Sequence, residues 1–205
     1  SPRFRLYAEF VIFSITIGVW PLLIPLDLGV SGLDSLMGLP LIGWMLTVIF
    51  CVGFVNSINM ADGANGLMAG VMTIAYGLFY TNTGEFVYAA MMTACAIFTI
   101  FNTISGRLFL GDAGAYGLGA SLAFSGLYLF YDDVFSAAFL ACLFAYPCID
   151  FIMTLARRYR AGRSIFLPDN DHLHNRLHYH FQRWLPSKTL ANSLTGGLVV
   201  TSSSG

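Results

Sequence analysis

Charged residues are scarce in this 205-residue chain, because Asp, Glu, Lys and Arg together make up only 10% of it. An ordinary soluble domain carries roughly 25%. Hydrophobic residues account for 57% of the chain, and its mean hydropathy is +0.70. So few polar side chains cannot cover so much apolar surface in water. The composition therefore excludes an ordinary soluble domain and indicates an integral membrane protein.

Internal repeats, a second soluble domain and a cysteine pattern are also lacking. The four cysteines lie inside apolar runs, where a free thiol behaves as a small apolar residue: Cys51, Cys95, Cys142 and Cys148. They predict neither a disulfide framework nor a metal cluster. We expect a single integral membrane domain over residues 1–205. Its one sizeable segment outside the membrane is the Arg- and His-rich loop at residues 156–189.

Seven apolar runs follow one another along the chain. They lie at about residues 6–26, 39–55, 67–80, 86–101, 116–131, 134–155 and 190–200. A helix that crosses a bilayer needs about 20 residues, so the shorter runs must extend into their flanking segments or be enclosed by protein. The pattern predicts an all-α polytopic transmembrane helix bundle with about six to seven spans.

Along this series of apolar runs, basic residues are absent from every second loop. All ten Lys and Arg residues and all four His residues fall on one side of it. In the loops on the opposite side, the charged residues are all acidic: Asp27, Asp34, Glu85, Asp132 and Asp133. The positive-inside rule makes the basic side cytoplasmic. Two Asn/Asp/Gly-rich loops share that side, so we expect cytoplasmic loops to form the functional site.

The first of these loops follows the second run. Its polar side chains recur every three residues and would form one ridge if the helix continued: Asn56, Asn59, Asp62 and Asn65. Gly63 and Gly66 permit a turn and the close approach of a ligand. A ligand site is one interpretation of the pattern. A helix cap with a glycine-rich turn, or a polar stripe that lines a transporter cavity, is the alternative.

The second loop carries a single acid, Asp112, between Gly111 and Gly114. A carboxylate in such a loop suits Mg²⁺, which prefers a few carboxylates together with substrate phosphates; Mn²⁺ is an alternative ion. Arg107 lies five residues before Asp112. It can pair with a phosphate or simply lie at the membrane interface.

The third segment, Pro168–His180, is rich in histidine. His172 and His174 suggest zinc, but no Cys or well-spaced carboxylate completes a set of four ligands locally. A surface that binds anions explains the basic, His-rich composition of this segment better than a zinc site does. Asp150, near the cytoplasmic end of the sixth run, is a functional candidate because ionisable groups inside spans are rare. Pairing with Arg157 or Arg158 is the structural alternative.

Together the three segments resemble the bacterial polyprenyl-phosphate N-acetylhexosamine-1-phosphate transferases of glycosyltransferase family 4. The matching motifs are N-x-x-N-x-x-D-G at Asn56–Gly63, F-N followed by G-D-x-G within Phe101–Gly114, and P-D-x-x-H-x-H at Pro168–His174. The resemblance implies transfer of a sugar-1-phosphate from a UDP-sugar to undecaprenyl phosphate, with release of UMP, for cell-envelope polysaccharide synthesis. It also implies a multi-pass protein of the bacterial inner membrane.

The resemblance also assigns roles to residues. Asp112 matches the Mg²⁺-binding Asp, Asn59 and Asp62 fall in the nucleotide-binding and catalytic loop, and His172 and His174 match the motif that helps bind the sugar and the diphosphate. We therefore expect Asp62 and Asp112 to be catalytic, with Asp112 as the metal ligand. The expected substrate-binding residues are Asn56, Asn59, Asn65, Arg107, Asp150, His172 and His174. The expected partners are the UDP-sugar, undecaprenyl phosphate and the membrane; nucleic acid is not expected, and a homodimer is possible.

Three departures from the family pattern qualify the resemblance. Asn65 stands where many members carry a second Asp, Asn175 stands where a further His is common, and the family's paired Asp-Asp motif is missing. We expect the chain to be incomplete at both ends and inactive by itself. An inactive scaffold and a membrane transporter or channel are the alternative functions. A transporter should carry ionisable groups near the bilayer midplane, whereas Asp62 and Asp112 are predicted at cytoplasmic ends of spans.

Overall fold

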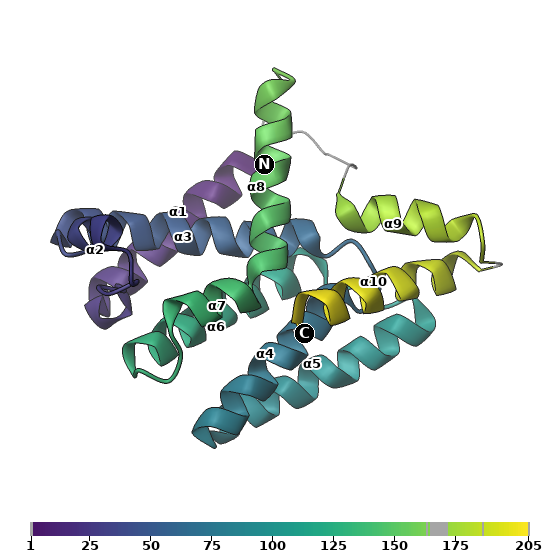
Figure 1. The fold of residues 1–205 in the computed structure, drawn as a ribbon, viewed down its shortest axis with the longest axis horizontal. Helices are drawn as coiled ribbons and strands as arrows, with labels where there is room; N and C mark the ends of the chain where they lie inside the picture. The colour runs from purple at the N-terminus through teal and green to yellow at the C-terminus, as the bar shows by residue number, and fades with distance from the viewer. Residues whose placement is uncertain (1, 163, 165–171, 186, 205) are drawn as a thin grey trace.

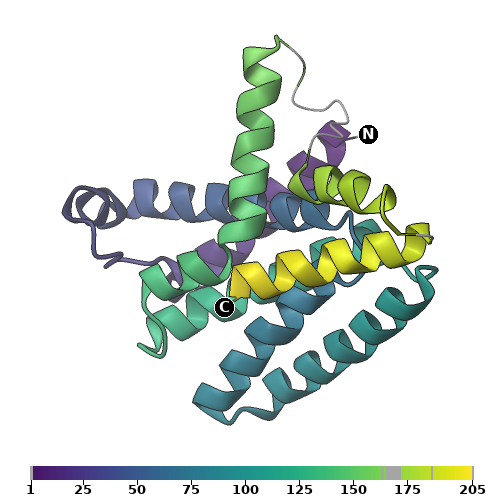
Figure 2. The ribbon, with the colours of Figure 1, turned by 45° about the vertical axis from the view of Figure 1, so that its right-hand side comes forward.

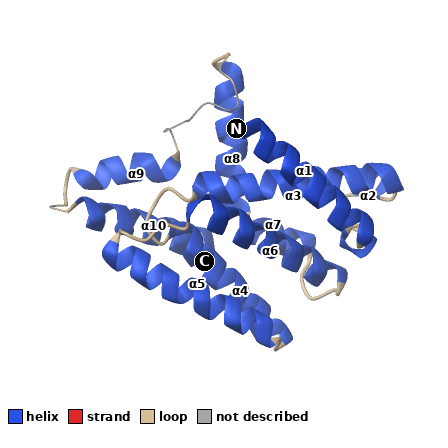
Figure 3. Ribbon diagram, turned by 180° about the vertical axis from the view of Figure 1, so that it is seen from behind, coloured by secondary structure: helices blue, strands red, loops and turns tan. Residues whose placement is uncertain are grey.

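The computed structural model describes residues 2–162, 164, 172–185 and 187–204, and every regular element within these residues is a helix (Figure 3). The elements in chain order are α1 (Pro2–Val19), η1 (Pro21–Leu23), α2 (Ser31–Met37), α3 (Pro40–Ala61), α4 (Leu67–Thr83), α5 (Phe86–Ser105), α6 (Gly111–Tyr131), α7 (Ala137–Leu143), α8 (Ala145–Arg160), α9 (Leu173–Gln182) and α10 (Lys188–Ser204). The all-α prediction is confirmed.

Three helices, α3, α5 and α6, are long and apolar enough to cross a membrane, and the bent pair α7 and α8 counts as a fourth if it forms one span. The other predicted runs also fold as helices. α1 has 18 residues but includes Arg3, Arg5 and Glu9, and α4 and α10 have 17 residues each, the lower limit for a span of about 17–25 residues. The chain is a polytopic membrane protein, and the count of six to seven spans stays a prediction.

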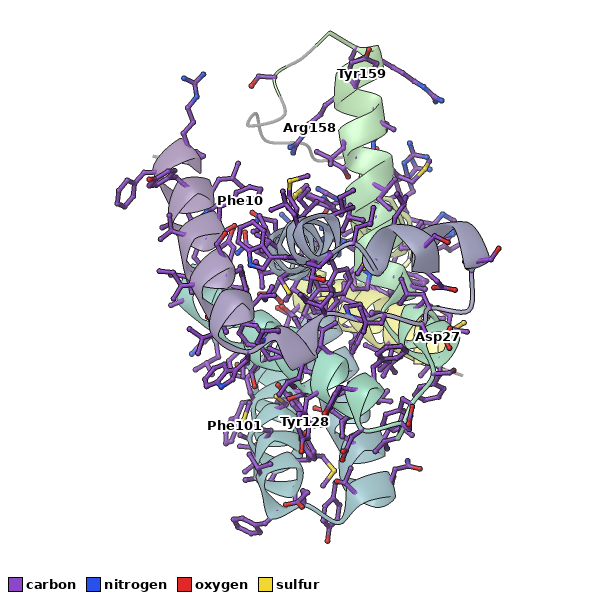
Figure 4. The ribbon with its side chains drawn as sticks, turned by 90° about the vertical axis from the view of Figure 1, so that its left-hand side faces the viewer. Phe10, Asp27, Phe101, Tyr128, Arg158 and Tyr159 are labelled. Carbon is purple, nitrogen blue, oxygen red and sulfur yellow. The ribbon has the colours of Figure 1, made fainter. Side chains whose placement is uncertain are left out.

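The run at residues 134–155 does not form one continuous helix. It breaks at Phe144, and α8 turns by 72° from α7. Pro147 lies in the first turn of α8, where its missing N–H costs no helical hydrogen bond, so the sequence suits a new helix start here. In Figures 1 and 2, the C-terminal part of α8 projects from the bundle, while its first part crosses α3, and Figure 4 shows Arg158 and Tyr159 at the projecting end.

The bundle is built on α3, which packs against α1, α6 and α8. α4 and α5 form a hairpin, and α10 lies along α4 and contacts α9 (Figure 1). The buried residues of α5 are Tyr88, Cys95 and Asn102, which are seven residues apart and form one narrow stripe. Several large apolar side chains of α5 are exposed, among them Ile100 and Ile104 and Phe101, which Figure 4 labels. Such a surface suits contact with lipid.

The polar ridge predicted after the second run is shorter than expected. Asn56 and Asn59 lie in the last turns of α3, but the helix ends at Ala61, with Asp62 as its C-cap. Asn65 lies in the following turn, just before Gly66, the N-cap of α4. The four side chains therefore divide into two pairs with different surroundings. We call the end of the bundle at which α3 ends and α6 begins the site end.

Candidate functional site

Asp112 lies at the site end, in the first turn of α6. Its side chain is 72% exposed, yet both carboxylate oxygens have partners. Arg5 of α1 donates from Nη1 to Oδ2 at 2.8 Å, and Asn59 of α3 donates from Nδ2 to Oδ1 at 3.2 Å. The structure thus brings together two of the predicted site residues, Asp112 and Asn59. Arg5 joins them from a segment that the sequence did not suggest.

The position of Asp112 on α6 favours anions. The first backbone N–H groups of a helix have no partner within the helix, and the N-terminal end of its dipole is positive. The N-cap, Leu110, supplies no side-chain acceptor to them. A phosphate placed beside Asp112 would meet both the backbone N–H groups and the Arg5 guanidinium.

Behind Asp112 lies a second set of polar contacts that centres on Asn56. Its Nδ2 donates to Glu9 Oε2 at 2.5 Å and to the Val52 carbonyl at 2.8 Å, while its Oδ1 accepts from the Tyr116 hydroxyl at 3.1 Å. The same hydroxyl lies 3.4 Å from Asn59 Oδ1. The predicted residue Asn56 is therefore held by protein partners.

Sequence reasoning missed Arg5, Glu9 and Tyr116. A signal for Glu9 was present, because it is an acid within the first apolar run, and the same argument had singled out Asp150. Tyr116 stands at the start of the fifth apolar run, a position that is typical of an interfacial aromatic residue. Its role as a hydrogen-bond donor depends on how α3 and α6 pack.

The loops that carry the first two motifs are bound to each other through Asn102, at the end of α5. Its side chain accepts a hydrogen bond from the Gly66 N–H and donates one to the Leu108 carbonyl. Gly66 has φ +75°, and a Cβ there would collide with Thr103 of α5. Glycine is thus needed at residue 66 both for its backbone conformation and for the close approach of α5.

Asp62 follows Asn59 by three residues and ends α3. Its side chain is half-buried, and burial raises the pKa of its carboxyl group from 3.8 to about 6. At pH 7 the Asp62 carboxyl group is ionised in most molecules, but it can take up a proton at a small cost in free energy. A general base working near neutral pH has such a pKa.

His174, in the first turn of α9, packs directly against Gly63. A Cβ at residue 63 would lie 2.8 Å from His174 Cδ2 and closer still to Nε2. The imidazole is buried and its Nδ1 lies 3.1 Å from the Tyr146 hydroxyl. Burial, followed by the neighbouring His172, lowers the pKa of His174 to about 4, so the ring is neutral at pH 7.

His172 pairs with Asp150. Its Nδ1 lies 2.6 Å from Asp150 Oδ2, and both side chains are buried. The His172 ring also stacks on His174 with centroids 5.2 Å apart. Arg157, one of the two arginines offered as the structural alternative for Asp150, donates from Nη2 to Thr154 Oγ1 at 3.0 Å. Asp150 thus holds the start of α9 against α8. The motif residues Pro168–Asp171 lie outside the described residues.

Two other predicted residues lie elsewhere. Asn65 is buried and bonds to α10, where its Nδ2 lies 3.3 Å from Ser193 Oγ and its Oδ1 accepts from Asn192 at 3.4 Å. This arrangement joins the turn before α4 to α10. Arg107 is exposed in the loop between α5 and α6, and its backbone N–H donates to Ser105 Oγ. The structure does not place Asn65 beside Asp112.

The chemistry of the Asp112 site fits a hard divalent cation. An exposed carboxylate is an oxygen ligand of the kind that Mg²⁺ accepts. Within the described part of the chain, no three His, Cys, Asp or Glu side chains are grouped to hold a metal ion by themselves. Mg²⁺ commonly completes its shell with waters and substrate phosphates, so a single carboxylate is compatible with it.

The chain is similar in sequence to one family of known proteins. The family model described as Glycosyl transferase family 4 matches residues 1–130. The chain is 31% identical over 148 residues to the Bacillus subtilis protein named "Probable undecaprenyl-phosphate N-acetylglucosaminyl 1-phosphate transferase", covering 66% of this chain and 41% of that protein.

Two further relatives have related names. The Mycobacterium leprae decaprenyl-phosphate N-acetylglucosaminephosphotransferase is 32% identical over 195 residues, which are 80% of this chain and 48% of the relative. The Lactiplantibacillus plantarum phospho-N-acetylmuramoyl-pentapeptide-transferase is 28% identical over 158 residues, which are 74% and 48% of the two chains. The chain thus spans less than half the length of each of these three relatives.

Proposed function

Because this chain belongs to glycosyl transferase family 4, we propose that it forms part of a bacterial enzyme that transfers a sugar-1-phosphate from a UDP-sugar to undecaprenyl phosphate and releases UMP. The observation that carries the proposal is the pair of contacts at the site end: Asn59 with Asp112, and Gly63 with His174. These contacts join all three motifs. The names of two relatives support a polyprenyl phosphate acceptor, and all three names support an N-acetylated amino sugar.

The reaction joins two anions. An oxygen of the acceptor phosphate attacks the β-phosphorus of the UDP-sugar, the bond from that phosphorus to the bridging oxygen breaks, and UMP leaves with the electron pair. Phosphoryl transfer of this kind needs positioning and positive charge more than covalent help from the protein. The site end offers both, through the Arg5 guanidinium and the N-terminus of α6.

Asp112 would hold the divalent ion, Mg²⁺ or Mn²⁺. Bound there, the ion offsets the repulsion between the two phosphates and polarises the β-phosphate. Arg5, which now pairs with Asp112, can share its remaining N–H groups with a phosphate oxygen. Arg107 is a second cation for the same anions, since its exposed side chain lies on the loop that leads to Asp112.

Asp62 is assigned the role of proton acceptor. An acceptor phosphate that carries a proton is a weaker nucleophile, and a carboxylate with a pKa of about 6 can take that proton near neutral pH. His172 and His174 are assigned to the donor sugar and diphosphate. Their buried rings are fixed by Asp150 and Tyr146, which sets the direction of the remaining ring nitrogens.

The acceptor's hydrocarbon tail needs an apolar path. A cavity of about 630 Å³ lies between α2, α3, α6 and α7, and apolar side chains line almost all of it. It reaches Phe54 and Cys148, which stand two residues before Asn56 and Asp150 respectively. We assign this cavity to the first isoprene units of the acceptor, so that its phosphate emerges at the site end.

The site end is assigned to the cytoplasmic side of the inner membrane. Arg5 and the basic end of α8 lie on the side where the positive-inside rule places cationic loops. Asp132, the C-cap of α6, marks the opposite side. A nucleotide sugar is made in the cytoplasm, so this orientation gives the donor direct access to the site.

The test is UMP release by the full-length protein in detergent, with undecaprenyl phosphate and a panel of UDP-sugars. We expect UMP to appear only when acceptor, a suitable donor and Mg²⁺ are all present. Asp112→Asn should lower the rate by at least about 100-fold, the loss typical when electrostatic stabilisation of a transition state is removed, here through the ion that Asp112 would hold. Asp132→Asn, at the other end of the same helix, is the matched control and should keep the wild-type rate. No UMP from any donor, or a normal rate for Asp112→Asn, would contradict the proposal.

A further inference from the structure

Six polar side chains from three helices close a ring at the site end. Each helix contributes two residues that are three or four positions apart and therefore point the same way. The members are Arg5 and Glu9 of α1, Asn56 and Asn59 of α3, and Asp112 and Tyr116 of α6. All six lie on helices that are otherwise largely apolar.

The ring can be followed from contact to contact. Glu9 accepts from Asn56, and Asn56 accepts from the Tyr116 hydroxyl. That hydroxyl also lies beside Asn59 Oδ1, and Asn59 donates to Asp112. Arg5 closes the ring, because it bonds to Asp112 Oδ2 and its Nε lies 3.8 Å from Glu9 Oε1.

The donors and acceptors of the ring fix one another's orientation. An ionised carboxylate only accepts hydrogen bonds, so Glu9 requires Asn56 to present its amide nitrogen. The Asn56 oxygen is then left for the Tyr116 hydroxyl, which has a single proton to donate. The Tyr116 ring in turn lies 4.8 Å from the Arg5 guanidinium, in cation–π contact. Glu9 and Tyr116 thereby hold the guanidinium of Arg5 from two sides, and Arg5 is the donor to Asp112 Oδ2.

Glu9 is the least expected member of the ring. The residue is only 8% exposed, and an acid buried in an apolar helix is costly unless it has a specific purpose. A residue that served only to join α1 to α3 could be apolar. A carboxylate is required if the contacts must have one direction and end on Asp112.

We propose that Glu9 and Tyr116 are positioning residues that set the geometry of the Asp112 carboxylate for its divalent ion. The inference rests on the proposed function, because it takes Asp112 as the metal ligand. Residues that orient a metal ligand commonly change metal affinity by 10- to 100-fold when they are replaced. We therefore expect Glu9→Gln and Tyr116→Phe each to weaken Mn²⁺ binding by about tenfold.

The experiment measures Mn²⁺ binding to the full-length protein in detergent, without substrates, from the electron paramagnetic resonance signal of the free ion. Tyr116→Phe removes one hydroxyl and keeps the ring under Arg5, while Glu9→Gln keeps the side-chain shape and removes the charge. Matched controls are Tyr128→Phe, near the other end of α6, and Glu85→Gln, which precedes α5 on the opposite side. Both controls should bind Mn²⁺ as the wild type does.

A second readout separates positioning from plain stability. The Mg²⁺ concentration for half-maximal UMP release should rise about tenfold in both variants, while KM for the UDP-sugar at saturating Mg²⁺ stays near the wild-type value. Unchanged Mn²⁺ affinity in both variants overturns the inference, and so does a lower unfolding temperature with normal affinity in the folded fraction. If Asp112→Asn binds Mn²⁺ as well as the wild type, the metal role of Asp112 in the proposed function fails instead.

Discussion

The imidazole of His174 lies against the α-carbon of Gly63, in the space that a side chain at residue 63 would occupy. This contact joins the turn after α3 to the start of α9, two segments that are far apart in the chain. It explains the glycine of the N-x-x-N-x-x-D-G motif by the approach of a histidine. The sequence had assigned that glycine to a turn and to the approach of a ligand.

Gly63→Ala is expected to displace His174 and lower kcat/KM for the UDP-sugar. A displacement of about 1 Å in a binding group costs on the order of 100-fold. Steady-state UMP release measures the effect. Gly117→Ala on α6 is the matched control, because a Cβ there meets open space. A kcat/KM for Gly63→Ala within about twofold of the wild type would show that the position of His174 is unimportant.

The double variant Gly63→Ala/His174→Ala gives an independent check of the same contact. Residues that act through one interaction are not additive. The double variant should therefore be no slower than His174→Ala alone. Full additivity of the two losses would mean that Gly63 acts on something other than His174.

Asp62→Asn is expected to change the pH profile of the reaction. In the wild type, protonation of Asp62, whose pKa is about 6, removes the proton acceptor and should make the rate fall below about pH 6. The variant should be slower by about 100-fold or more at pH 7.5 and should lack that acidic limb. Rates measured between pH 5 and pH 8.5 give the result. An acidic limb that survives in the variant would assign it to another group.

The same substitution should raise the stability of the folded protein. Burial raises the pKa of Asp62 in the folded state above its unfolded value of 3.8, so ionisation at neutral pH disfavours folding. Asn carries no charge, and the gain should be roughly 1–2 kcal/mol after allowance for the partial exposure of the side chain. The gain should be complete above about pH 7 and should fade between pH 6 and pH 4.

Unfolding temperatures in detergent at several pH values measure this gain. Asp132→Asn, which removes an exposed carboxylate, serves as the control and should leave the unfolding temperature unchanged at all of them. A lower unfolding temperature for Asp62→Asn at pH 8 would mean that the Asp62 carboxylate makes a stabilising contact with the protein.

Ala138→Trp tests the acceptor cavity. Ala138 lines that cavity, and the large ring should narrow it. We expect KM for undecaprenyl phosphate to rise about tenfold, equivalent to about 1.4 kcal/mol of binding free energy, while KM for the UDP-sugar stays the same. Ala94→Trp, at an exposed position of α5, controls for an added tryptophan in the membrane. Equal KM values for the acceptor in the two variants would exclude this cavity as its binding site.

Much of the fold could be predicted because it depends on local properties of the chain. The apolar runs became helices, and the expectation that their ends extend into the motifs is met by α3, which includes Asn56 and Asn59, and by α6, which begins at Gly111. The break at Phe144 was not predicted, since hydropathy does not distinguish one long helix from two that meet at an angle. The ridge was predicted too long because the end of α3 depends on the turn at Asp62 and Gly63.

The motif residues of the candidate site were predicted from the sequence, but the residues that hold them in place were not. Asn59 and Asp112 could be chosen from their residue types and from the loops that carry them. Glu9 carried a signal as an acid within an apolar run, but its partner was not predictable, and Tyr116 is unremarkable within its own helix. The hydrogen bonds that these two residues make depend on how closely α1 and α6 pack against α3. The partner of Asp150 was also out of reach, since His172 comes 22 residues later and on another helix.

By itself the sequence determined that this protein is a membrane protein and that its elements are helices. It also determined which polar motifs interrupt those helices. These properties follow from composition and periodicity, which depend on neighbouring residues. The tertiary structure decided which of those polar groups meet. Three sets of contacts join separate parts of the fold: the ring around Asp112, the packing of His174 against Gly63, and the pairing of Asp150 with His172. Such contacts require particular packing distances and angles, which no local pattern specifies.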